Sequence, residues 1–221
     1  MTITLRPGNT VMFTGDSITD GLRRQSGDGL GFGYPARVAG EWGRRHPDRP
    51  VTWLNTGNAG DKVMDLEARW RADVLDARPD VLSVLVGVND AGWQTLHPED
   101  GRVIPVEEFE AGYDRLLAPL AEAGTGLILV EPFLLPIHGV VEAGAVLVGE
   151  VERARWRADL DPKIQAVRRL ARRYGALLLA ADGMFAELAA KAEPEHWAAD
   201  GVHPTSAGHA ALAAAWLGLV A

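Results

Sequence analysis

An α/β fold with a parallel sheet is predicted by two features of the sequence. Short apolar runs rich in Val, Leu and Ile, each typical of a buried strand, alternate along the chain with longer segments of helical periodicity. This alternation implies strands joined by right-handed helical crossovers. We therefore expect a three-layer α/β/α domain with five parallel strands in the order 2-1-3-4-5.

Apolar patterning and turn residues place the elements in order. Strands are expected near 10–14, 51–56, 80–86, 126–131 and 176–180, and helices near 34–46, 62–77, 106–123, 150–174, 184–192 and 205–219. Asp61 is the expected N-cap of the second helix, and Thr205 or Ser206 that of the last. The segments 91–105 and 132–148 are expected to be loops. The second is apolar and is expected to pack over the site or against a second subunit.

Composition limits the function. The 221 residues suit one domain, 1–221, without a linker or repeat. The net charge of −8 predicts no binding to nucleic acid or to an anionic membrane and favours a neutral substrate. The chain has no cysteine, which excludes thiolate catalysis, and its scattered histidines form no metal pattern. The N-terminus has no signal-like apolar stretch, so a cytoplasmic location is expected.

A candidate nucleophile lies at the end of the first strand. The apolar run Val11–Phe13 leads into Gly-Asp-Ser, a turn that would expose the hydroxyl of Ser17 at the carboxyl end of the strand. Ligands of open α/β sheets bind at this edge. Asp16 is expected to stabilise the turn. By itself, a serine in such a turn is usually only a turn former.

A candidate base and its partner lie near the other end of the chain. Asp200 and His203 are three residues apart in a loop marked by Gly and Pro, so a tight turn can aim both side chains the same way. A serine hydroxyl needs a base to take its proton, and the base needs a third group to fix its tautomer. Ser17, His203 and Asp200 could fill these roles. The alternative is a loop held by an Asp–His hydrogen bond.

In the flavodoxin-like strand order 2-1-3-4-5, three candidate site residues follow neighbouring strands. Ser17 comes after the first strand, Gly60 after the second and Asn89 after the third. Because the carboxyl ends of parallel strands meet at one edge, we expect the three residues to converge. Taken singly, Gly60 and Asn89 are more often plain turn residues.

The chain resembles the SGNH, or GDSL-like, hydrolases, whose four sequence blocks are all present in order. They are GDSITDG with Ser17, NTGNAGD with Gly60, GVND with Asn89, and DGVHP with Asp200 and His203. The resemblance implies a serine esterase with a Ser17–His203–Asp200 triad and no cofactor or metal. It also implies an oxyanion hole formed by the backbone N–H groups of Ser17 and Gly60 and the amide of Asn89.

The segment EPFLLP at 131–136 makes the chain similar to the bacterial SGNH subgroup that includes acetylxylan esterases. That similarity implies removal of acetyl groups from xylo-oligosaccharides, and a homo-oligomer, as found in the subgroup. Trp93 and Trp197 are expected in loops near the site, where they could stack on a sugar ring or simply pack.

Other functions remain open at this stage. Within the family, the rivals are a short-chain lipolytic esterase and a thioesterase. Outside it, they are a carbohydrate-binding module on an inactive fold and a flavodoxin-like or receiver domain. The basic cluster at 168–173 is expected to be a solvated helix face.

Overall fold

The computed structural model has a five-stranded parallel sheet in the order β2-β1-β3-β4-β7, which confirms the predicted order. Its strands are β1 (Thr10–Gly15), β2 (Thr52–Asn55), β3 (Val81–Leu85), β4 (Gly126–Val130) and β7 (Leu177–Leu179). The structure describes residues 2–96, 102–137, 141–143 and 146–221, with the backbone alone for 93–96, 141–143 and 146–147. β1 lies inside the sheet, because Val11 pairs with Trp53 of β2 and with Val81 of β3.

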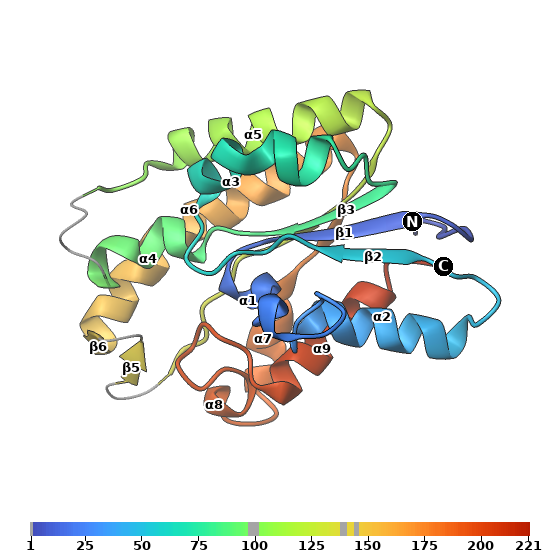
Figure 1. Ribbon diagram of the computed structural model, residues 1–221. Coiled ribbons are helices and arrows are strands. Elements are labelled where there is room, and N and C mark those ends of the chain that lie inside the picture. Colours follow the sequence, from blue (N-terminus) through green and yellow to red (C-terminus); the bar gives the residue numbers. More distant parts are fainter. Residues whose placement is uncertain (1, 97–101, 138–140, 144–145) are drawn as a thin grey trace.

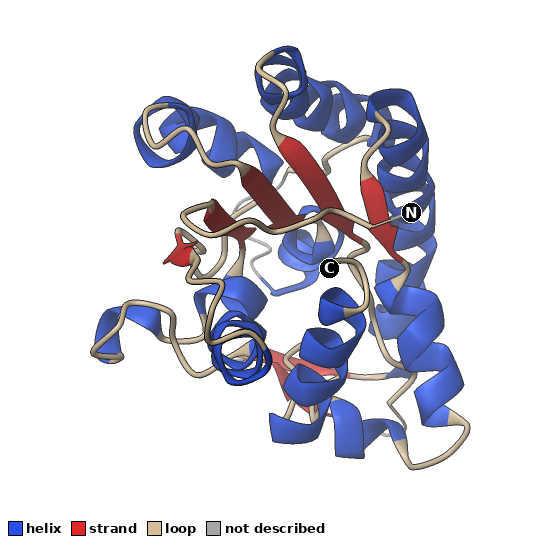
Figure 2. Ribbon diagram, turned by 90° about the vertical axis from the view of Figure 1, so that its right-hand side faces the viewer, coloured by secondary structure: helices blue, strands red, loops and turns tan. Residues whose placement is uncertain are grey.

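Helices cover both faces of the sheet (Figure 1), and the view turned by 90° shows the same layers (Figure 2). One face packs against α2 (Tyr34–Arg45), α7 (Ala181–Ala189) and α9 (Ser206–Leu217), and the other against α3 (Val63–Trp70), α5 (Val106–Glu122) and α6 (Glu150–Tyr174). Side chains alternate between two cores: Val11 and Phe13 enter the first, and Met12 enters the second. This two-sided burial explains why the strands are continuously apolar.

The remaining elements are short. They are α1 (Ser17–Asp20), the 3-10 turn η1 (Arg23–Gln25), the π-helical turn η2 (Arg71–Leu75), α4 (Val88–Leu96), the antiparallel pair β5 (Val141–Ala143) and β6 (Val146–Val148), and α8 (Pro194–Trp197). Within the described ranges, no helix combines the length and the apolar character needed to cross a bilayer.

The prediction of a loop over 91–105 is wrong at its start, because α4 runs to Leu96. Gly92 lowers the helix propensity of this segment. However, a Cβ atom on Gly92 would lie 1.8 Å from the ring of Trp156, so the glycine provides the space in which this tryptophan packs. Tertiary packing therefore outweighs the local preference. Residues 97–101 lie outside the described part of the chain.

The structure also bears on three smaller expectations, with a different outcome for each. Thr205 is the N-cap of α9 and accepts a bond from the Gly208 N–H at 3.3 Å, as predicted. The N-cap of α3 is Lys62 rather than Asp61, because Asp61 is engaged by Arg69 at 2.8 Å. The segment 132–148 is less irregular than expected, since it includes β5 and β6. Whether it forms a lid or an interface stays a prediction, because residues 138–140 and 144–145 lie outside the description.

The basic cluster on α6 is paired rather than simply solvated. Arg168 contacts the fully buried carboxylate of Glu131 at 2.6 Å, and Arg169 contacts Glu110 at 2.5 Å. Arg173 lies 3.0 Å from Asp114. These ion pairs join α6 to the end of β4 and to α5, and only the first has a buried partner. The Arg168–Glu131 pair should therefore contribute most to stability.

We expect Arg168→Ala to lower the free energy of unfolding by roughly 3 kcal/mol, because it leaves the buried Glu131 carboxylate without its counter-charge. The exposed Arg172→Ala is the matched control and should change stability by less than about 0.5 kcal/mol. Urea unfolding measures both, and adding Glu131→Gln to Arg168→Ala should recover part of the loss. Equal stabilities for the two single variants would show that the pair contributes nothing.

Candidate active site

Ser17 is the first residue of α1 and follows directly on the end of β1. Asp16 caps this helix, accepting a bond from the Ile18 N–H at 3.0 Å, as expected for a residue that stabilises the turn. Gly15 precedes it with φ of 150°, and a Cβ atom there would lie 1.9 Å from the carbonyl oxygen of Leu85. Only glycine fits this close approach between β1 and β3. The sequence Gly-Asp-Ser thus forms a tight turn that presents the hydroxyl.

The structure brings Ser17, His203 and Asp200 into one hydrogen-bonded chain. The Ser17 hydroxyl lies 3.0 Å from Nε2 of His203, and Nδ1 of His203 lies 2.6 Å from the Asp200 carboxylate. An ionised carboxylate only accepts, so Nδ1 carries the proton and Nε2 is left to accept from the serine. This is the tautomer that a general base needs.

The loop that carries Asp200 and His203 is held by main-chain bonds. The second carboxylate oxygen of Asp200 accepts from the N–H of Val202 at 2.9 Å and from the N–H of His203 at 2.7 Å. The carbonyl of Gly201 accepts from the N–H of Leu135 at 2.9 Å, which ties the loop to the segment after β4. The short Asp-x-x-His spacing therefore orients both side chains locally.

The groups around His203 favour its protonated imidazole. The hydrogen bond to Asp200 raises the pKa of His203 above its ordinary value, outweighing burial, and the charges of Asp200 and Asp16 act in the same direction. Burial acts to raise the pKa of Asp200, but its bonds to His203 and to backbone N–H groups outweigh that effect, so the net pKa is lowered. Burial raises the pKa of Asp16 to about 7.

The second and third sequence blocks meet beside this turn. The side-chain amide of Asn89 donates to the carbonyl of Asp61 at 3.1 Å, and the N–H of Asn58 donates to the carbonyl of Gly15 at 2.9 Å. The loop that contains Gly60, whose φ is 85°, is thus held between β1 and the start of α4. One N–H of the Asn89 amide is used in this contact, and the amide carries a second.

The two candidate sugar contacts, Trp93 and Trp197, were both expected in loops, and both lie in helices instead. Trp93 lies in α4 rather than in a loop, and its side chain lies outside the description. Trp197, the last residue of α8, is half-buried against the first core, and its indole N–H donates to the carbonyl of Leu188 at 3.1 Å. This bond fixes the ring and uses its only donor. A role in sugar binding stays a prediction for both.

Asp90 and Arg69 also support the site and were not singled out from the sequence. A carboxylate oxygen of Asp90 accepts from the Val63 N–H at 3.1 Å, next to the Asn89–Asp61 contact. Arg69 donates to the carbonyl of Thr56 at 2.7 Å as well as to Asp61. Asp90 could have been noticed because it adjoins Asn89 in GVND, whereas no local signal marks Arg69. Among the described side chains, no three His, Asp or Glu residues group as metal ligands.

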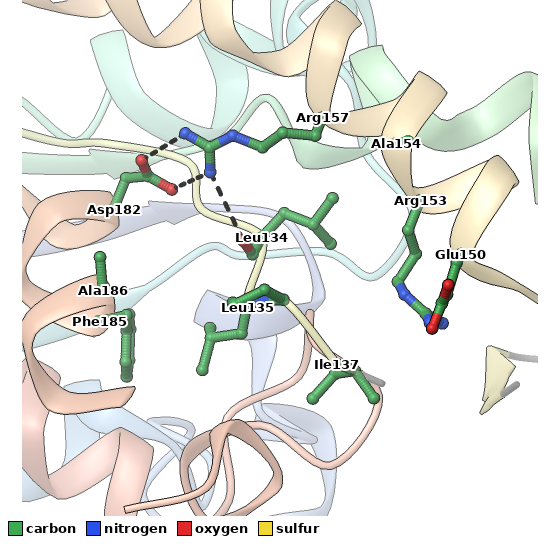
Figure 3. Close-up of a pocket in the computed structure, with 11 residues that line it drawn as sticks. Leu134, Leu135, Ile137, Glu150, Arg153, Ala154, Arg157, Asp182, Phe185 and Ala186 are labelled. Carbon is green, nitrogen blue, oxygen red and sulfur yellow. Dashed lines mark hydrogen bonds and ion pairs between the residues drawn. The ribbon is translucent and has the colours of Figure 1, made fainter. Parts of the chain in front are cut away.

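A mainly apolar pocket lies beside the segment that follows β4 (Figure 3). It measures about 600 Å³ and lies between the extended segment 134–137, α6 and α7. Arg157 spans its wall and makes two bonds to Asp182, at 2.6 and 2.7 Å. None of the predicted site residues lines this pocket, so it is separate from the Ser17–His203 pair.

The imidazoles of His203 and His209 should titrate far apart, and NMR of the ring protons measures this. We expect the pKa of His203 to lie above its ordinary value of 6.5, and that of His209 near 4, because burial disfavours the charged ring of His209. Asp200→Asn should lower the pKa of His203, because it removes the main group that favours the protonated ring. An unchanged His203 titration in that variant would contradict the charge assignment.

Most of the chain matches a known protein family. Residues 13–211 match the model of the GDSL-like Lipase/Acylhydrolase family. The chain is 32% identical over 216 residues to an acetylxylan esterase of Geobacillus stearothermophilus, covering 95% of this chain and 93% of the relative. This match confirms the predicted similarity to the acetylxylan esterase subgroup.

Solved structures agree with these sequence matches. A putative GDSL-like lipase from Parabacteroides merdae superposes with a TM-score of 0.86 at 30% identity, covering 99% of this chain and 98% of that one. The Geobacillus stearothermophilus acetylxylan esterase superposes with a TM-score of 0.82 at 31% identity, covering 97% and 95%. The chain therefore belongs to the GDSL-like lipase/acylhydrolase family and is a carboxylic ester hydrolase.

Proposed function

We propose that this protein is a serine acetylesterase that removes acetyl groups from carbohydrate, with acetylated xylo-oligosaccharides as its substrates. The observation that carries the reaction is the hydrogen-bonded chain from Ser17 through His203 to Asp200. The choice of substrate is supported by the similarity to an acetylxylan esterase along 95% of the chain.

In the first half of the proposed reaction, Nε2 of His203 takes the proton of the Ser17 hydroxyl while the oxygen attacks the acetyl carbonyl carbon. The tetrahedral intermediate carries a negative charge on the former carbonyl oxygen. When it collapses, the ester C–O bond breaks, His203 gives its proton to the sugar oxygen, and the sugar leaves with a free hydroxyl. Asp200 stays ionised and stabilises the imidazolium.

In the second half, water replaces the sugar. His203 takes a proton from the water, whose oxygen attacks the acetyl group on Ser17. The second tetrahedral intermediate then releases acetate, and His203 returns its proton to the serine oxygen. The sum is one ester and one water converted to one alcohol and one carboxylic acid.

The oxyanion of both intermediates would be held by preorganised donors. In our proposal these are the backbone N–H groups of Ser17 and Gly60 and the second N–H of the Asn89 amide. Asn89 is suited to this because its other N–H is already bonded to Asp61, which fixes the amide plane before substrate arrives. Of the two tryptophans expected to contact the sugar ring, Trp197 is the one whose side chain the structure describes, and its bond to Leu188 fixes the ring.

The substrate is tested by measuring acetate release from acetylated xylo-oligosaccharides beside hydrolysis of p-nitrophenyl acetate, octanoate and palmitate. We expect release from the sugar and fast turnover of the acetate ester only, both lost in Ser17→Ala. Turnover of the p-nitrophenyl esters without release from the sugar would leave the mechanism standing but contradict the substrate assignment, and would favour a short-chain lipolytic esterase. Activity that survives Ser17→Ala would disprove the mechanism.

The pH profile of kcat/KM tests His203 as the base. Only the neutral ring can accept the serine proton, so activity should rise with pH through the pKa of His203, with a midpoint above 6.5. Asp16→Asn keeps an oxygen for the Ile18 N–H and removes a carboxyl that is partly ionised in this range, because its pKa is about 7, so the profile should shift slightly to lower pH. A profile that falls with rising pH over this range would exclude a neutral His203 as the base.

A further inference from the structure

Helix α6 packs against α4, the helix that begins one residue before Asn89 (Figure 1). The contact centres on Trp156, whose side chain is 3% exposed and belongs to a small core with Val88 and Leu160. The indole Nε1–H of Trp156 donates to the carbonyl oxygen of Val88 at 3.0 Å. A side chain 67 residues from Asn89 in sequence therefore bonds to the peptide unit directly before it.

The fit of Trp156 depends on a glycine in the same helix. A Cβ atom on Gly92 would lie 1.8 Å from Cε2 and 2.2 Å from Nε1 of the indole, so any larger residue would displace the ring from Val88. Val88 and Ala91 beside it are fully or almost fully buried. The packing thus holds the indole ring in one position, in which its only donor points at the Val88 carbonyl.

The other side of the same helical turn is bonded to the Gly60 loop. Asn89 donates to the carbonyl of Asp61, and Asp90 accepts from the Val63 N–H, both at 3.1 Å. The first turn of α4 is therefore held from two directions, by the residues after Gly60 and by Trp156. If the indole bond is removed, the bonds to the loop and the apolar packing of Val88 against Leu160 remain, but the Val88 carbonyl loses its hydrogen bond from α6.

We propose that Trp156 is a positioning residue for the oxyanion hole, which holds the Val88 peptide and so sets where the Asn89 amide points. This inference rests on the proposed function in one respect, the use of Asn89 as an oxyanion donor. Such donors act only when they are aimed at the place where charge develops, so a small displacement reduces turnover. Trp156 is 3% exposed and is not one of the proposed contacts of the substrate, so binding of ground-state substrate should change little when it is replaced.

The test uses Trp156→Phe, which removes the N–H and keeps most of the packing, with p-nitrophenyl acetate as substrate. The matched control is Trp70→Phe, because the Trp70 indole also donates a buried hydrogen bond, at 3.0 Å to the carbonyl of Leu116. Trp70 lies on α3 and Leu116 on α5, and neither helix carries a proposed catalytic group. We expect kcat to fall about tenfold in Trp156→Phe with KM changed less than about twofold. The control should lose a similar amount of thermal stability and keep its kcat.

A double-mutant cycle with Asn89→Ala separates positioning from a general loss of structure. Without the amide there is nothing for Trp156 to aim, so in the Asn89→Ala background Trp156→Phe should lower kcat by less than about twofold. If Trp156→Phe is too unstable, 3-benzothienylalanine at position 156 replaces the N–H by sulfur and preserves the ring shape. It should give the same loss of kcat.

Two outcomes would overturn the role of Trp156. One is a kcat in Trp156→Phe equal to that of Trp70→Phe, and the other is an equal loss of kcat with and without Asn89. Either result, combined with inactive Ser17→Ala and impaired Asn89→Ala, would leave the proposed function intact. Failure to release acetate from sugar would overturn the substrate assignment alone, because this cycle uses p-nitrophenyl acetate.

Discussion

The bond between Ser17 and His203 joins residues 186 positions apart, and it can form only if both ends of the chain reach one edge of the sheet. β1 brings Ser17 to the interior of that edge, between β2 and β3. The loop with His203 is brought there by its bond between Gly201 and Leu135, just beyond β4. Both contacts depend on main-chain geometry, so the sheet topology, more than any single side chain, assembles the site.

Two aspartates buried near the carboxyl edge of the sheet lower the stability of the fold at neutral pH. Burial raises the pKa of both Asp16 and Asp90 to about 7, and one carboxylate oxygen of each lacks a hydrogen-bond partner among the described residues. For a carboxyl with a raised folded-state pKa, the contribution to stability is fully present below the unfolded pKa of 3.8 and is lost as pH rises toward 7. Asp16 and Asp90 nevertheless cap the Ser17 turn and hold the Gly60 loop, so site geometry is retained at the expense of stability.

The sequence predicted what depends on local patterns and connectivity. Strand order followed from the alternation of elements, and the positions of Ser17, Gly60 and Asn89 followed from the rule that parallel strands end at one edge. Helix α4 was not predictable, because Gly92 in its middle disfavours a helix, and only the tertiary packing of the Trp156 ring beside it offsets this. The Arg168–Glu131 pair was also not predicted, because it too depends on tertiary packing. Helical spacing shows that arginines share a face, but it does not show that a buried carboxylate from another element meets that face.

The fold that this chain shares with its relatives does not determine the substrate. The putative lipase and the acetylxylan esterase resemble this chain about equally, with TM-scores of 0.86 and 0.82 and identities of 30% and 31%, so backbone similarity does not separate a lipase from an acetylxylan esterase. The proposed triad would act on either, because it would contact only the ester group. If the proposed mechanism holds, discrimination would depend on side chains around the acyl and alcohol groups of the substrate, among which Trp197 is the candidate that the structure describes.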